Sequence, residues 1–295
     1  MIYAFIAGHC SGLPVVACCR VMGVSKSGFY EWQHRQVNPC RRIVEDRALT
    51  ETIHSIWRKS RAVYGSPRVW AELRLGTGIR VGRKRVERLM RQAGIEGVFR
   101  PKRGGCTRRN PSDASSADLI RRQFHPSGPD RLWVADITEH PTREGKVYAA
   151  VVIDAWSRRV VGWSISDHLR TELVCDALDM ALWRRKPPPG QLIHHTDHGS
   201  QYTSWVFGQR LRTAGLLGSM GTVGDALDNA LAESFFGTLQ LELLDRKQWK
   251  TRRELATAIF EYIEAFYNPE RRHSALNYQT PIQYETSHAT LTEVA

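Results

Sequence analysis

The 295-residue sequence has no long hydrophobic run and few cysteines, and both shortages argue against an exported or membrane-spanning protein. Residues 1–19 are moderately apolar, but polar and helix-breaking positions interrupt them, no positive charge precedes them, and a spanning helix needs about 20 apolar residues. The six cysteines form no CxxC pair, and the adjacent Cys18 and Cys19 suit two ligands of one tetrahedral zinc ion poorly. We therefore expect free thiols, no membrane partner and a cytoplasmic location.

The sequence also lacks a repeat at any fixed period, which argues against a solenoid or a propeller. Its composition, 42% hydrophobic and 24% charged, is typical of a globular chain rather than a disordered one or a coiled coil. At roughly 150 residues per domain, the length suggests about two domains.

Acidic residues are scarce in the first part of the chain. The whole sequence has 42 Lys and Arg against 30 Asp and Glu, a net charge of +12. Up to residue 110 there are 22 basic and 7 acidic residues, a net charge of +15, and the rest of the chain carries −3. Solvated surface charge is the ordinary explanation of a basic chain. An excess confined to one part favours a separate segment that binds nucleic acid.

Residues 15–32 show helix-turn-helix patterning. An apolar helical run is followed by a break at Gly23 and by a short helix for which Ser25 is the expected N-cap. Lys26 lies on the polar face of that helix, where it would reach a DNA groove or a phosphate. An ordinary helical hairpin is the alternative for this segment.

A second helix-turn-helix segment is expected at residues 64–97. Its last helix has an apolar stripe, and cations cover its other faces. The candidate DNA-binding cations are Arg80, Arg83, Lys84, Arg85, Arg88 and Arg91. Only Glu87 counterbalances them within that helix, so we expect a phosphate backbone to neutralise them, with a solvated face as the alternative.

The remainder predicts a mixed α/β sheet flanked by helices. Strand-like runs occupy residues 132–137, 147–155, 160–165 and 192–195, and helical patterns occupy 172–183, 203–214, 228–244 and 252–267. We expect an N-terminal helical region (1–60), a second helix-turn-helix segment (61–101), a linker rich in Gly, Ser, Arg and Asn (102–126), the α/β core (127–245) and a C-terminal helical extension (246–295).

Three carboxylates stand out in the α/β core. Asp136 and Asp197 end the first and fourth expected strands, where open α/β sheets bind ligands. Glu233 lies on an expected helix, away from its apolar face. Each aspartate taken alone is equally consistent with a turn or cap, and the glutamate with a solvated helix face. Sixty residues separate the aspartates, and 35 separate Asp197 from Glu233.

The blocks VADIT, HHTDHGSQYTS and DNALAESFFGTLQ resemble the three catalytic blocks of retroviral integrases and of the second-frame (OrfB-type) transposases of bacterial insertion sequences. The bacterial group is the closer match because the resemblance extends through residues 64–97 and 267–285. It implies a ribonuclease-H-like mixed sheet with flanking helices, preceded by an all-helical helix-turn-helix DNA-binding region. It also implies that Asp136, Asp197 and Glu233 are the catalytic residues and the ligands of two divalent ions, Mg²⁺ or Mn²⁺.

The implied reaction is transposition. Water first liberates a 3′-hydroxyl at an element end, and that hydroxyl then attacks a target phosphodiester. The implied partners are element-end and target DNA and further copies of this chain in a homo-oligomer on DNA, with the product of an upstream reading frame as a candidate. Because its implied partner is DNA, we expect the protein in the cytoplasm, associated with the nucleoid.

The face of the expected helix that carries Glu233 also carries Asn229 and Gln240, so both are expected near DNA. The resembled family commonly has a basic residue at the position of Gln240. The glutamine therefore predicts a weaker contact with DNA ends, and a lysine there should tighten it. The loop GTVGDAL at residues 221–227 is also more glycine-rich and less basic than the family pattern.

Phosphodiester transfer needs an activated oxygen nucleophile and a stabilised oxygen leaving group, which two divalent ions about 3.5–4 Å apart supply. Hard ions such as Mg²⁺ prefer carboxylate ligands. Three alternatives remain. A zinc site could use His194, His195 and His198, although no HxxxH or CxxC spacing supports it. A serine or tyrosine recombinase would need an activated Ser25, Ser27 or Tyr30. A DNA-binding regulator would keep the carboxylates without cutting DNA.

Overall fold

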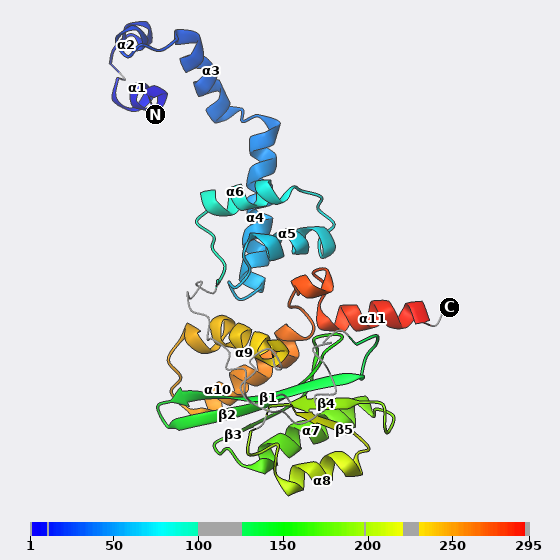
Figure 1. Ribbon diagram of the computed structural model, residues 1–295. Helices are drawn as coiled ribbons and strands as arrows, with labels where there is room; N and C mark the ends of the chain where they lie inside the picture. Colours follow the sequence, from blue (N-terminus) through cyan, green and yellow to red (C-terminus); the bar gives the residue numbers. More distant parts are fainter. Residues whose placement is uncertain (1, 11, 100–125, 198, 221–229, 293–295) are drawn as a thin grey trace, which may run out of the picture. The chain divides into compact units, whose positions relative to one another are not determined.

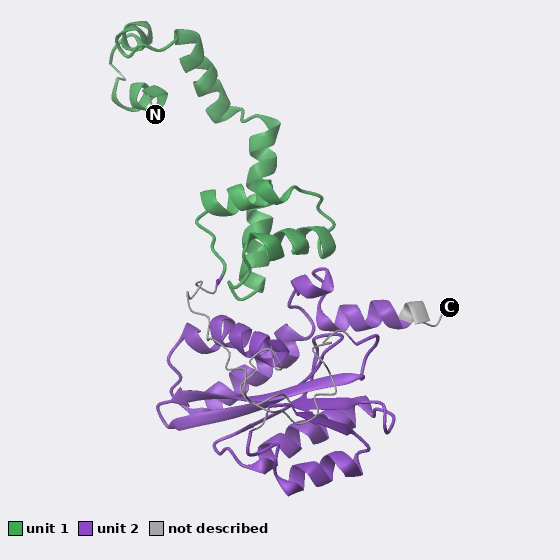
Figure 2. Ribbon diagram, in the orientation of Figure 1, with its two compact units in different colours: residues 1–97 green, residues 98–295 purple. Residues whose placement is uncertain are grey.

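The computed structural model describes all residues except 1, 11, 100–125, 198, 221–229 and 293–295. The chain divides into two compact units, residues 1–97 and 98–295 (Figures 1 and 2). The linker expected at 102–126 lies almost wholly outside the described residues. Over the described part of the chain, no helix is both long and apolar enough to cross a membrane.

The first unit is helical throughout its described secondary structure. Its helices are α1 (Ile2–His9), α2 (Val15–Val21), α3 (Lys26–Val37), α4 (Arg41–Lys59), α5 (Ser66–Leu75) and α6 (Arg83–Gln92). Helices α1 to α3 enclose a small core that includes Ile6 and Phe29. Ser25 is the N-cap of α3, as expected, because its hydroxyl accepts a hydrogen bond of 3.2 Å from the Gly28 N–H.

Helix α4 packs against both α5 and α6, and these two pack against each other. The apolar stripe of α6 is buried in this bundle at Val86, Leu89 and Met90, as the sequence predicts. Trp70 of α5 fixes the turn between α5 and α6, since its indole N–H donates a hydrogen bond of 2.8 Å to the Val81 carbonyl. The basic segment is therefore a three-helix bundle with a defined turn.

The second unit is built on a five-stranded sheet in the order β3-β2-β1-β4-β5. The strands are β1 (Leu132–Thr142), β2 (Gly145–Asp154), β3 (Val160–Ser166), β4 (Ile193–Thr196) and β5 (Leu217–Met220). The first three form an antiparallel meander, whereas β4 runs parallel to both β1 and β5. The four strands expected from the sequence are present. Strand β5 was not expected, because its four residues LGSM contain a glycine and show no apolar alternation.

Helices cover both faces of the sheet, with α7 and α8 on one face and α9 and α10 on the other (Figure 1). They are α7 (Thr171–Arg185), α8 (Trp205–Thr213), α9 (Ala230–Glu242) and α10 (Arg252–Glu261), followed by a π-helical turn (Tyr262–Tyr267) and α11 (Pro281–Thr292). Two 3₁₀ turns, Leu244–Arg246 and Ser274–Leu276, lie between them.

The main core lies between the sheet and α7 with α8. Trp133 and Ala135 of β1 belong to it. Successive side chains of a strand point to opposite faces, so Val134 and Asp136 face the other side, which α9 covers. Helix α7 approaches β3 so closely that a Cβ at Gly162 would lie 2.1 Å from the Ala177 carbonyl oxygen. The strand alternation thus turns one carboxylate of the predicted trio toward the helix that carries Glu233.

Candidate active site

Asp136 and Asp197 lie at the same level on neighbouring parallel strands. In the pairing of β1 with β4, Val134 is opposite His195, so two further residues along each strand lead to the two aspartates. Neighbouring strands are about 4.8 Å apart, which places the two carboxylates side by side at the carboxyl end of β4. The expectation that Asp136 ends its strand is wrong, because β1 continues to Thr142 through its pairing with β2, whereas Asp197 does follow the end of β4. The adjacency of the two aspartates follows from the register of β1 with β4.

A hollow of about 200 Å³ opens at the two aspartates. We call it the carboxylate hollow; its lining residues are Asp136, Ile137, Thr138, Glu139, Tyr148, Leu169, Asp197, Gly199, Gln201 and Tyr202. One oxygen of each aspartate is fixed by the backbone. The Ile137 N–H donates to Asp136 Oδ1 at 2.8 Å, and the Gly199 N–H donates to Asp197 Oδ1 at 3.0 Å. The second oxygen of each carboxylate is left for another partner.

Asp136 is the more enclosed of the two aspartates and has an unusual acidity. Its pKa is raised to about 7, mainly by burial and also by the charges of Asp197 and Glu233, against the lowering effect of the hydrogen bond from the Ile137 N–H. The negative charges of two other carboxylates, Asp197 and Glu233, therefore act on the partly buried Asp136 carboxylate. Such a group is destabilised as an anion unless a cation neutralises it.

Glu233 lies on the helix that covers the same face of the sheet as Asp136. It is exposed and lies in the first turn of α9, and this helix packs against β1. Its charge acts on Asp136, but its side chain does not line the carboxylate hollow. Within the described residues, no three His, Cys, Asp or Glu side chains come together closely enough to hold a metal ion. The structure thus brings the two aspartates together and leaves Glu233 beside them.

The far end of α9 is anchored by a buried ion pair. Arg271 donates two hydrogen bonds to Glu242, 2.7 Å to Oε1 and 2.8 Å to Oε2, and Tyr262 donates a third of 2.9 Å to Oε2. The side chains of Arg271 and Glu242 are only 4% and 3% exposed. This contact ties the helix that carries Glu233 to the segment after the π-helical turn.

The neighbouring histidines do not form a zinc site among the described residues. His194 is buried against Phe207, and burial together with His195 lowers the pKa of His194 to about 3, so its ring is neutral. His195 is also buried, with Nδ1 3.2 Å from the Ser219 hydroxyl. The two rings lie on opposite faces of β4 because they are consecutive in the strand. His198, the third histidine of the zinc hypothesis, lies outside the described residues.

Tyr202 is the residue of the hollow that sequence reasoning missed. It is 3% exposed, and in the described structure its hydroxyl is buried without a hydrogen-bond partner. Burial and then the charges of Asp136 and Asp197 raise its pKa well above the usual value, so the phenol keeps its proton and remains a donor. Tyr202 lies within the block HHTDHGSQYTS, but the sequence does not show that its hydroxyl is buried beside the aspartates. In the structure its ring packs against Phe207.

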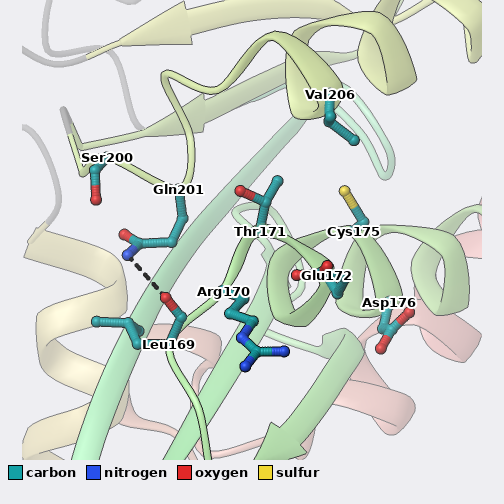
Figure 3. A pocket seen from close by; sticks show the side chains of 9 residues that line it. All are labelled: Leu169, Arg170, Thr171, Glu172, Cys175, Asp176, Ser200, Gln201 and Val206. Atoms are coloured by element: carbon teal, nitrogen blue, oxygen red, sulfur yellow. Dashed lines mark hydrogen bonds between the residues drawn. The ribbon is translucent and has the colours of Figure 1, made fainter.

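A second hollow of about 560 Å³ shares Leu169 and Gln201 with the carboxylate hollow (Figure 3). The Gln201 side-chain amide donates a hydrogen bond of 3.3 Å to the Leu169 carbonyl, and this contact lies where the two hollows meet. Arg170, Glu172 and Asp176, at and near the start of α7, line this second hollow. Its charges are therefore mixed and favour neither an anion nor a cation.

Gln240 has a partner that the sequence did not suggest. Its side-chain amide donates to a carboxylate oxygen of Asp245, five residues further on. Asn229, expected on the same helical face, lies outside the described residues, as does the loop at 221–227. The side chain at position 240 thus lies next to an acid.

The cations predicted to bind DNA fall into two groups. Arg85 and Arg88 both bind Asp46 of α4, each at 2.7 Å, and Arg91 binds Glu87 at 2.9 Å. Glu87 is the only acid within α6, but Asp46, which is distant in the sequence, also neutralises two of its cations. Arg80, Arg83, Lys84 and Lys26 are exposed.

Comparisons with known proteins agree with this architecture. Family models described as an integrase core domain match residues 126–226 and 215–281, and a model of an HTH-like domain matches residues 44–103. The chain is 38% identical over 285 residues to the transposase InsF for insertion sequence IS3A of Escherichia coli (strain K12), which covers 97% of this chain and 98% of the relative.

A second relative is the transposase for insertion sequence element IS629 of Shigella sonnei. It is 38% identical over 273 residues, which are 92% of this chain and 90% of the relative. Among solved structures, the HTLV-2 integrase catalytic core domain in complex with magnesium is 20% identical, covers 54% of this chain and 98% of that chain, and has a TM-score of 0.40.

Proposed function

The chain belongs to the family of insertion-sequence transposases related to IS3, and its activity is therefore DNA transposition. We propose that Asp136, Asp197 and Glu233 perform the polynucleotidyl transfer with two divalent cations. Family membership confirms the relationship indicated by the three carboxylate blocks. It also establishes that the first unit, with its HTH-like domain, belongs to a DNA-binding protein.

The observation that carries the proposal is the register that sets Asp136 beside Asp197. An all-oxygen donor set suits Mg²⁺ or Mn²⁺ rather than zinc. The raised pKa of Asp136 supports the fit, since a carboxyl group held near two other carboxylates is neutralised by a bound cation. The divalent cations would supply the charge that activates the attacking oxygen and stabilises the leaving oxygen.

The chain's own groups provide orientation. The Ile137 and Gly199 N–H groups hold one oxygen of each aspartate, so that the other oxygen is directed to a ligand. Glu233 would complete the ligand set from α9, whose position the Glu242–Arg271 pair holds. The proposed order of reaction is attack of water at the element end and then attack of the liberated 3′-hydroxyl on target DNA.

The first unit would hold the DNA. Residues 1–97 contain 17 basic and 7 acidic residues, a net charge of +10 out of the chain's +12. A charge of this size favours binding to the phosphate backbone. We propose that several copies act together on DNA, with the product of an upstream reading frame as a further candidate partner.

The experiment is cleavage of element-end DNA with Mg²⁺ by Asp136→Asn, Asp197→Asn and Glu233→Gln. Each should lower the cleavage rate by more than about 100-fold, because even the partners of metal ligands account for about 10- to 100-fold. DNA affinity and melting temperature should remain near those of the unmodified chain. The control is Asp179→Asn, which removes an exposed carboxylate that pairs with Arg210 on the surface.

Near-normal cleavage by any one of the three variants contradicts the assignment of that residue. If the unmodified chain binds element ends but never cuts them with Mg²⁺ or Mn²⁺, the DNA-binding regulator is the correct alternative.

A further inference from the structure

The cations of α6 are not equivalent, because a carboxylate from α4 engages two of them. Arg85 Nε donates to Asp46 Oδ1 and Arg88 Nη2 donates to Asp46 Oδ2, both at 2.7 Å. The Asp46 side chain is only 16% exposed, and the two arginines are about one-third exposed. Their charge is thus largely satisfied inside the unit, where they join α6 to α4.

A different group of cations surrounds a hollow of about 550 Å³ on the same bundle. We call it the Trp70 hollow; its lining residues are Trp70, Arg74, Leu75, Gly78, Arg80 and Val81. Arg74 and Arg80 are exposed, and within the described part of the chain no carboxylate lines this hollow. It is therefore a concave surface of one charge sign.

Hydrogen bonding and ring contacts hold Trp70 in place in the Trp70 hollow. The Trp70 indole N–H is bonded to the Val81 carbonyl, which fixes the turn that leads into α6. The Arg83 guanidinium carbon lies 4.2 Å from the centre of the Trp70 ring, and that of Arg74 lies 5.8 Å from it. Attraction between a guanidinium and the face of an aromatic ring holds such a side chain against the indole.

The position of the hollow within the motif suggests the anion. In helix-turn-helix proteins the second helix enters the major groove by its N-terminal end, so the preceding turn lies beside the phosphate backbone. Here that turn carries Arg80, α6 begins at Arg83, and Arg74 is at the end of α5. Arg74 and Arg80 line the same hollow and repel each other, and a bound phosphate would relieve that repulsion.

We propose that the Trp70 hollow binds a phosphate of the DNA backbone through Arg74 and Arg80, with Arg83 held beside it on the indole, while Arg85 and Arg88 stabilise the bundle instead. The proposal rests on the proposed function, because DNA is its ligand. It adds Arg74 and Trp70 to the DNA-binding surface and assigns the middle of α6 a structural role.

The test compares two double variants of the full chain that remove equal charge. Arg74→Gln/Arg80→Gln removes the two proposed phosphate contacts. Arg42→Gln/Arg47→Gln removes two exposed arginines of α4 and is the matched control. The measurement is affinity for an element-end duplex and for a duplex of scrambled sequence, each over a series of salt concentrations. Circular dichroism checks that both variants remain folded.

Each phosphate contact contributes about 0.9 to the slope of log affinity against log salt. The Arg74→Gln/Arg80→Gln variant should therefore flatten the slope by about 1.8 on both duplexes, because a backbone contact carries no sequence information. The control should flatten it by less than half of that. Arg80→Lys keeps the charge and should retain most of the slope.

Equal slopes in the two double variants overturn the proposal, and so does a loss confined to the element-end duplex, which indicates contact with bases. These outcomes leave the proposed function intact. If the unmodified chain shows no salt-dependent DNA binding, the proposed function itself fails.

Discussion

Tyr202 is a residue whose environment folding alone does not explain. Its hydroxyl is buried beside Asp136 and Asp197, and no described group accepts its hydrogen bond. A buried polar group without a partner destabilises a protein by about 1–3 kcal/mol. A cost of that size is tolerated where the group meets a partner during function, here within the carboxylate hollow.

We expect Tyr202→Phe to separate function from stability. The variant loses no hydrogen bond of the structure, so its melting temperature should be equal to or higher than that of the unmodified chain. Its Mg²⁺-dependent cleavage should fall about 10- to 100-fold, as for other groups that orient metal ligands. Tyr284→Phe, which removes a hydroxyl from a ring packed on Trp156, is the control. A lower melting temperature with unchanged cleavage would show that the hydroxyl has a structural partner.

Residues differ in how far the sequence reveals their role. Asp136 and Asp197 could be predicted because each carboxylate directly follows an apolar run in the sequence, although β1 continues beyond Asp136 to Thr142. The strand register brings both aspartates to one level. The ion pairs of Arg85 and Arg88 with Asp46 could not be predicted, because Asp46 lies about 40 residues away in the sequence and only the packing of α4 on α6 brings it near. The burial of the Tyr202 hydroxyl beside the two aspartates could not be predicted from the sequence either.

At the scale of elements, the predicted ribonuclease-H-like core and the preceding helix-turn-helix region are confirmed. Apolar runs and periodicity were sufficient for the three-stranded meander and for α7 to α10, which each contain at least seven residues. It was insufficient for β5, whose place in the sheet is determined by pairing with β4 rather than by its own four residues.

Helix α9 gives a prediction about charge. The sequence suggests that Gln240→Lys tightens binding to element ends, but the structure places Asp245 next to residue 240. A lysine there would first pair with Asp245, and an exposed pair of this kind contributes about 0–1 kcal/mol while it cancels the new charge. We therefore expect little gain in affinity from Gln240→Lys and a larger gain from Gln240→Lys/Asp245→Asn.

The measurement is affinity for element-end DNA at low and high salt, since screening weakens a surface charge contact. Asp245→Asn alone is the control. An equal affinity for all variants at both salt concentrations would show that this face of α9 does not meet DNA.

The anchoring of α9 gives a prediction about stability. Arg271→Met leaves the Glu242 carboxylate buried without its cation, and breaking such a pair costs about 3–5 kcal/mol. Replacing both partners, as in Glu242→Leu/Arg271→Met, should cost less, because no charge remains buried. Urea denaturation measures both. If the double variant has a lower free energy of unfolding than Arg271→Met, the destabilisation of Arg271→Met is not explained by an unpaired buried charge, and this expectation is wrong.

At the scale of the whole molecule, the two units differ in net charge. Residues 1–97 carry a net charge of +10, whereas residues 98–295 contain 25 basic and 23 acidic residues, a net charge of only +2. Each unit has a buried core of its own, Ile6 and Phe29 in the first and Trp133 with its neighbours in the second. The domain boundaries predicted from the sequence, with a linker at 102–126, stay a prediction. Fragments cut on either side of this linker can test it.

We expect fragments 1–97 and 126–295 to fold separately and to divide the activities. The first should bind DNA with most of the salt dependence of the full chain and should not cut it, because nearly all of the net charge is there. The second should unfold cooperatively and should bind element-end DNA far more weakly at about 0.15 M salt, where the Debye length is about 8 Å and little net charge attracts the backbone. Far-ultraviolet circular dichroism and salt-dependent binding measure both expectations. If fragment 126–295 binds DNA as tightly as the full chain, the catalytic unit supplies the affinity, and the basic unit must have another role.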